Sequence, residues 1–169
     1  KSLQDDTQPL GLRGQIITAL AQSQDPSVAA LFRQLLQSGS VYVIQLAALG
    51  SGLMRDRKAA KPLAEILVKF RNTYTLSAVA LALAAIGTDD ALNALATALM
   101  QGEENLRRAA AEAFANHPAE GWETLKEALG IDDILVRRSA LHGLARIQQP
   151  WAEELILHTQ LEDKEWAVR

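Results

Sequence analysis

The stretch Leu135-Val-Arg-Arg-Ser-Ala-Leu-His-Gly-Leu-Ala-Arg-Ile147 decides the fold of this chain. Its apolar residues recur three or four positions apart, which places them on one face of a helix. They are Val136, Ala140, Leu141, Leu144 and Ile147. Small residues at 140, 143 and 145 allow a neighbouring helix to approach closely. The stretch therefore predicts an amphipathic helix that packs against other helices.

The same pattern returns along the whole chain. With Val136 as position zero, we place the equivalent residues at Leu12, Val41, Thr75, Leu106 and Val168, with spacings of 29, 34, 31, 30 and 32 residues. A large residue recurs at position eight in five segments: Leu20, Leu49, Leu83, Phe114 and Leu144. Self-similarity at such a period is the signature of a repeat protein in which each unit packs on the next.

A second set of helices is expected between these segments. Asp25-Pro26 is typical of a helix start, Asp89-Asp90 predicts the cap of another, and glycines such as Gly39 predict helix ends. No segment alternates with period two, so we expect no strands. Two helices per period divide the chain into 1–24 (a partial repeat), 25–54, 55–88, 89–117, 118–149 and 150–169 (a truncated repeat).

Two irregularities stand out in this arrangement. The longest spacing, between Val41 and Thr75, predicts an inserted loop over residues 50–60, and insertions in repeat arrays often carry binding sites. The chain also stops where a sixth second helix should begin. We therefore expect a piece of a longer protein, with Trp166 exposed at the truncated end and available for end-to-end self-contacts.

The segments Leu106–Phe114, Val136–Leu144 and Val168-Arg169 resemble the second helix of short bacterial HEAT-like repeats. These repeats of about 30 residues also occur in the phycobilin-lyase group. The resemblance covers almost the entire chain and is strongest over residues 103–147. It implies an all-α, right-handed α-solenoid of about five antiparallel helix pairs, similar to an armadillo-like superhelix. It implies no single function, because such arrays serve many roles.

The composition excludes several classes of function. The chain has 169 residues, 49% of them apolar and only 5% aromatic, and a net charge of −3, which gives no general attraction to nucleic acid or membranes. It has no cysteine, which excludes disulfides and thiolate metal sites and suits the cytoplasm. No apolar run is long enough to span a membrane. We predict no catalytic, cofactor-binding or metal-binding residue.

Arginine recurs at position one of the repeats, as Arg13, Arg107, Arg137 and Arg169. These residues could form an anion-binding ladder, or each could pack on the core and pair with an acid of the preceding turn. The candidate acids are Glu103, Asp133 and Glu165. We favour the structural interpretation.

A different set of residues is predicted to face a partner. The period places Arg108, Glu112, Arg138, His142 and Arg146 on the exposed side of the second helices. The equivalent positions in the first half are less polar: Gly14, Thr18, Val43, Ala47, Ser77 and Leu81. We therefore expect a non-catalytic scaffold that binds a protein or peptide on its concave face. The alternatives are a component of a phycobilin-lyase-like enzyme and a nucleic-acid-binding array.

Overall fold

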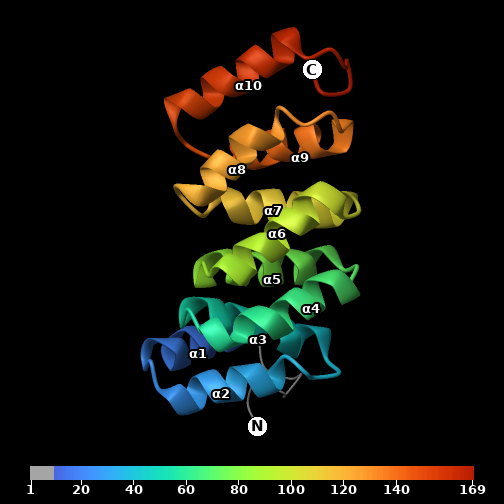
Figure 1. Ribbon diagram of the computed structural model, residues 1–169. Helices are drawn as coiled ribbons and strands as arrows, with labels where there is room; N and C mark the ends of the chain where they lie inside the picture. Colours follow the sequence, from blue (N-terminus) through green and yellow to red (C-terminus); the bar gives the residue numbers. More distant parts are fainter. Residues whose placement is uncertain (1–9) are drawn as a thin grey trace.

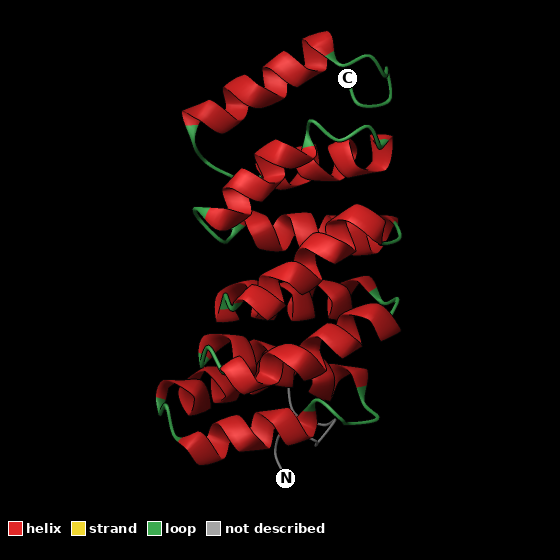
Figure 2. Ribbon diagram, viewed as in Figure 1, coloured by secondary structure: helices red, strands yellow, loops and turns green. Residues whose placement is uncertain are grey.

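The computed structural model describes residues 10–169, and within that range every regular element is a helix (Figure 2). A single short 3₁₀ turn, Arg57–Ala59, precedes the fourth α-helix. The α-helices are α1 (Leu10–Gln22), α2 (Pro26–Leu35), α3 (Val41–Leu53), α4 (Ala60–Lys69), α5 (Thr73–Ile86), α6 (Asp89–Gln101), α7 (Glu104–Ala115), α8 (Glu120–Ala128), α9 (Ile134–Leu144) and α10 (Pro150–Glu162).

The helices form two layers that are stacked in chain order from α2 at one end to α10 at the other (Figure 1). In one layer, each of α1, α3, α5, α7 and α9 packs extensively on the next. In the other layer only α4 and α6 are in appreciable contact, and that contact is smaller than any between neighbouring inner helices, so the outer helices are spread further apart. The array is an α-solenoid, as the sequence predicts, and we call the tightly packed layer the inner layer because a stack curves toward its closer-packed side.

Polar side chains fix where several helices begin. The carboxylate of Asp25 accepts a hydrogen bond from the amide of Ser27 at the start of α2, followed by Pro26, as predicted. Asn72 caps α5 and Asp133 caps α9 in the same way. At α6 the prediction was wrong by one residue. Thr88 is the cap and accepts from the amide of Ala91, whereas Asp89 and Asp90 lie in the first turn.

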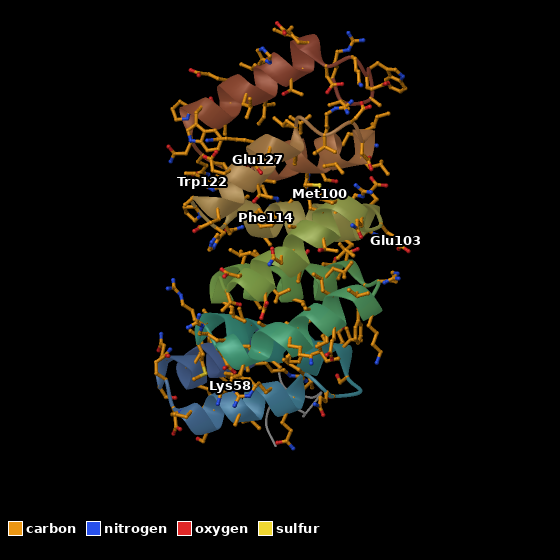
Figure 3. All side chains as sticks on the ribbon, in the orientation of Figure 1. Lys58, Met100, Glu103, Phe114, Trp122 and Glu127 are labelled. Carbon is orange, nitrogen blue, oxygen red and sulfur yellow. The ribbon has the colours of Figure 1, made fainter. Side chains whose placement is uncertain are left out.

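The core lies between the two layers and repeats with the chain. In α9 the residues at positions zero, four and eight, Val136, Ala140 and Leu144, are buried. The same holds for Thr75, Val79 and Leu83 in α5. Phe114 of α7 sits in the middle of the stack (Figure 3). Alanines and glycines between these residues let the inner helices pack closely, which is the arrangement that the opening stretch predicts.

The predicted alignment of the second repeat is wrong by two residues. In α3 the buried residues are Val43, Ile44, Ala47, Ala48 and Ser51, whereas Leu49 is 42% exposed. Position zero of this repeat is therefore Val43, and the spacings along the chain become 31, 32, 31, 30 and 32 residues. Val43 and Ala47, expected on the concave face, belong to the core. The sequence pattern predicts a large residue at position eight of each repeat, whereas α3 has the buried Ser51 there.

Two glycines explain why α3 departs from that rule. A Cβ on Gly50 would lie 2.5 Å from the ring of Phe32, so this aromatic residue of α2 fills the space that a leucine of α3 would otherwise occupy. A Cβ on Gly52 would lie 2.9 Å from the Cα of Ala82 in α5. The predicted inserted loop over residues 50–60 is therefore also wrong. Most of it is the end of α3 and the 3₁₀ turn, and Gly50, Ser51 and Gly52 are buried between helices.

Candidate functional site

Four positions on each inner helix face away from the outer layer, and their chemistry changes along the stack. On α3 they are Tyr42, Leu46, Leu49 and Leu53; on α5, Tyr74, Ala78, Leu81 and Ala85; on α7 and just after it, Asn105, Ala109, Glu112 and Asn116; on α9 and just after it, Leu135, Ser139, His142 and Arg146. Successive residues are three or four positions apart, so each set forms one stripe on its helix. The face is apolar over α3 and α5 and becomes polar and charged over α7 and α9.

The apolar part is hollowed between α3 and α5. A groove of about 600 Å³ is lined by Leu46, Leu49, Leu53 and Leu81 together with small residues, Gln45 and Asn116, the residue that caps the end of α7. Leu49, Leu53 and Leu81 are between 42% and 47% exposed, although buried leucines abound elsewhere in the chain. We call this feature the apolar groove. In this groove, leucine side chains that are not part of the core are exposed to solvent.

The charged part contains the residues predicted to bind a partner. His142 Nε2 lies 2.7 Å from Glu112 Oε1, and Arg146 Nη2 donates to the same oxygen at 2.6 Å. The stacking of α7 on α9 brings Glu112 and His142 together, although they are 30 residues apart in the sequence. These three side chains form one cluster across α7 and α9, in which the carboxylate of Glu112 is shared by two partners.

Arg108 and Arg138 lie beside this cluster and remain exposed. They line a hollow of about 160 Å³ with Glu104, Leu135, Ser139 and His142, which we call the arginine hollow. Neither guanidinium hydrogen-bonds or ion-pairs with any residue in the part of the chain that the structure describes. The hollow thus offers two unpaired cations on adjacent inner helices.

The arginines at position one have a different environment. Arg137 is 4% exposed, donates from Nε and Nη2 to the two oxygens of Asp163 at 2.8 and 3.0 Å, and donates to the carbonyl of Ile131. Arg107 donates to the carbonyls of Gly102 and Leu99 and lies 3.3 Å from Asp133. The structural interpretation holds for these two residues. The partner was wrong, however, because each arginine reaches an acid of the following repeat rather than of its own turn.

These pairs perturb both carboxylates. The hydrogen bonds from Arg137 hold the pKa of Asp163 below its usual range. Burial alone would raise the pKa of Asp133, but hydrogen bonds from the amides of Leu135 and Val136 and the charge of Arg107 outweigh it, so that the pKa is lowered. Glu103, the third candidate acid, projects outward at the turn before α7 (Figure 3), 3.3 Å from Arg71.

Aromatic residues mark the outer layer at the C-terminal end. The rings of Trp122 on α8 and Trp151 on α10 have centroids 5.5 Å apart, and Lys126 lies 4.4 Å above the Trp151 ring. Trp122 is also labelled in Figure 3. Trp166 is 80% exposed, as predicted. This cluster ties α8 to α10 on the side opposite the inner face.

Sequence reasoning found the charged part of the inner face but missed most of the apolar groove. Of its four leucines only Leu81 was predicted to face a partner, because the wrong register assigned Leu49 to the core. The glycines at 50 and 52 were the available signal, because glycine inside a helix indicates that a neighbouring helix approaches closely there, here Phe32 of α2 at Gly50 and Ala82 of α5 at Gly52.

Comparison with known proteins agrees with the repeat pattern. A family model described as HEAT repeats matches residues 31–115, just over half of the chain. The chain belongs to the HEAT-repeat family. No curated protein sequence matches this HEAT-repeat chain. Its fold is similar to the solved structure of human deoxyhypusine hydroxylase in complex with glycerol, with a TM-score of 0.43 and 18% sequence identity over 97% of this chain and 77% of that chain.

Two further properties concern the described part of this HEAT-repeat chain. Over residues 10–169, no group of three or more histidine, cysteine or acidic side chains is arranged to hold a metal ion. Within the same range, none of the helices has the length and apolar character needed to cross a membrane.

Proposed function

We propose that this HEAT-repeat chain is a non-catalytic scaffold that binds an unstructured segment of a protein partner along its inner face. The observation that carries the proposal is the apolar groove between α3 and α5. Leu49, Leu53 and Leu81 are exposed there although the core is complete without them. Contiguous exposed apolar surface of this kind is typical of an interaction site.

The size of the groove suits side chains rather than a folded domain. Its volume of about 600 Å³ is within the range of sites that take a small molecule or a few side chains. Covering a half-exposed leucine contributes on the order of 1 kcal/mol, so two or three apolar side chains in the groove supply a useful part of a binding free energy. A short peptide segment with closely spaced apolar residues fits this requirement.

The surroundings of the groove favour a peptide over a purely apolar ligand. Gln45 and Asn116 line the groove together with its leucines. Amide side chains both donate and accept hydrogen bonds, as an extended backbone requires. The groove therefore combines an apolar lining with two amide side chains that can hydrogen-bond to a main chain.

Selection from a random dodecapeptide library on the immobilised 169-residue chain tests this proposal. We expect enrichment of peptides with two closely spaced apolar residues. Enrichment should disappear when Leu49→Asp and Leu81→Asp are combined, because two carboxylates in the groove must then be desolvated. The matched control is Leu161→Asp, which changes a 77% exposed leucine of α10. Absence of enrichment on the unmodified chain, or equal enrichment on the double variant, would contradict the proposal.

A further inference from the structure

The two arginines of the arginine hollow differ from the other inner-layer arginines beside them. Arg107 and Arg137 are buried and bound to carbonyls and carboxylates, and Arg146 is paired with Glu112. Arg108 and Arg138 follow Arg107 and Arg137 directly in the sequence, yet they face the inner side without an acidic partner within residues 10–169. In each pair of neighbouring arginines, the first stabilises the fold and the second is available to bind a ligand.

Stacking brings the available guanidinium groups into one site. Arg108 and Arg138 occupy the same position of consecutive repeats, 30 residues apart, on helices that pack directly on each other. The Leu135 side chain and the buried Ser139 supply the floor of the hollow between them. Two guanidinium groups over a partly apolar floor form an environment that favours a carboxylate, because guanidinium presents paired N–H donors that match its two oxygens.

We propose that the arginine hollow binds an acidic side chain, aspartate or glutamate, of the same peptide whose apolar residues occupy the apolar groove. This inference rests on the proposed function. It adds that the peptide carries a negative charge and that it lies along the inner face from the apolar groove to the arginine hollow. The net charge of the side chains that line the hollow favours a ligand group with a single negative charge. The two arginines are opposed by one carboxylate, Glu104, at the rim. One further carboxylate balances the site, whereas a phosphate dianion exceeds it.

The distance between the two sites defines the spacing in the peptide. The groove lies between α3 and α5, and the hollow lies between α7 and α9, two repeats further along the stack. Adjacent packed helices are about 10 Å apart, so the centres of the two sites are separated by roughly 20 Å. An extended chain advances about 3.3 Å per residue, which places the acidic residue about six positions from the apolar pair.

The peptide library provides the test, with Arg108→Glu and Arg138→Glu combined as the second target. Peptides selected on the unmodified chain should carry an acidic residue about six positions from the apolar pair. On the charge-reversed chain the apolar pair should remain enriched and the acidic residue should be lost. The control is Arg57→Glu with Lys58→Glu, which makes the same charge change at two exposed residues of the 3₁₀ turn.

Titration calorimetry with one selected peptide gives the magnitude. Replacing its acidic residue by the amide should weaken binding to the unmodified chain by about ten- to a hundredfold, as expected for a charge-assisted hydrogen-bonded pair. The same replacement should have almost no effect on the charge-reversed chain, and the difference should shrink as salt is raised.

The outcomes separate this inference from the proposed function. Selection of peptides with the apolar pair but no acidic preference overturns only the inference, as does an acidic preference that persists on the charge-reversed chain. No selection at all overturns both. Sedimentation showing that the chain dimerises, and becomes monomeric with Leu49→Asp and Leu81→Asp, also overturns both, because a second copy would then occupy the groove.

Discussion

Arg137 on α9 and Asp163 after α10 are joined by two parallel hydrogen bonds, and their side chains are only 5% and 7% exposed. The two residues are 26 positions apart, and the same separation joins Arg107 to Asp133. Each pair links the second helix of one repeat to the turn before the second-helix position of the next. The pairs therefore connect consecutive repeats in the C-terminal half of the array.

The pair between Arg137 and Asp163 should make stability depend on acid. Because the pKa of Asp163 is lowered in the folded state, its contribution is fully present above its ordinary pKa of about 4 and is lost as pH falls through the lower, folded value. Asp163→Asn should therefore reduce the free energy of unfolding at pH 7 and flatten its decline at acidic pH. Urea unfolding between pH 2 and 7 measures both effects. Glu127→Gln, at an exposed carboxylate of α8, should leave the profile unchanged.

The close approach at Gly52 predicts an unusual response to alanine. In most helices, replacing glycine by alanine stabilises by up to about 1 kcal/mol. At Gly52 the new Cβ would meet the backbone of Ala82, so we expect a destabilisation of about 1–3 kcal/mol instead. Gly14, in α1, is the control because nothing lies within 4 Å of its would-be Cβ, and Gly14→Ala should stabilise. If both variants gain stability in chemical denaturation, the close contact between α3 and α5 is refuted.

Leu49 and Leu83 both occupy position eight in the sequence pattern, but the structure predicts that they contribute differently to stability. Leu83 is fully buried, and Leu83→Ala should cost about 2–5 kcal/mol of stability. Leu49 is 42% exposed in the apolar groove, and Leu49→Ala should cost less than about 1 kcal/mol. Thermal and urea denaturation of the two variants compares them directly. If both variants lose the same stability, Leu49 is a core residue and the register of α3 described above is wrong.

Glu112 should weaken the binding of acidic peptides. Its carboxylate lies beside the arginine hollow and pairs with Arg146 and His142. Glu112→Gln removes this negative charge and releases Arg146, so a peptide with the proposed acidic residue should bind about two- to fivefold more tightly. Titration calorimetry at low salt measures the change. A peptide that has the amide in place of the acid is the control and should bind equally to both proteins.

The regular part of this fold could be predicted from the sequence because it depends on periodicity. Val136, Ala140 and Leu144 indicate a buried stripe whatever they pack against, and the repetition of that stripe predicts stacking. The register of α3 could not be predicted in the same way. There the volume of Phe32, on another helix, replaces a large residue at position eight. Such compensation between helices is a property of three-dimensional packing.

The candidate site shows the same division. Arg108, Arg138 and Arg146 were placed correctly on the inner face because they lie in the most regular repeats. The choice of Asp163 rather than Asp133 as the partner of Arg137 depended on the path of the chain after α10, which no periodicity specifies. The apolar groove depended on the register of α3. Local sequence patterns thus predicted which face of a helix is exposed. Which two residues form an ion pair could be read only from the assembled structure.

The placement of the buried arginines divides the array into segments with different responses to acid. Position one is a buried arginine in α1, α7 and α9 (Arg13, Arg107 and Arg137), whereas it is Ile44 in α3 and Leu76 in α5. Protonation of Asp133 and Asp163 should therefore weaken the contacts that join α7 and α9 to the repeats that follow them. On acidification the molecule should unravel from its C-terminal end, and amide hydrogen exchange should accelerate in α9 and α10 before α3 and α5. A bound segment would then lose its acidic anchor first and remain held by its apolar residues alone.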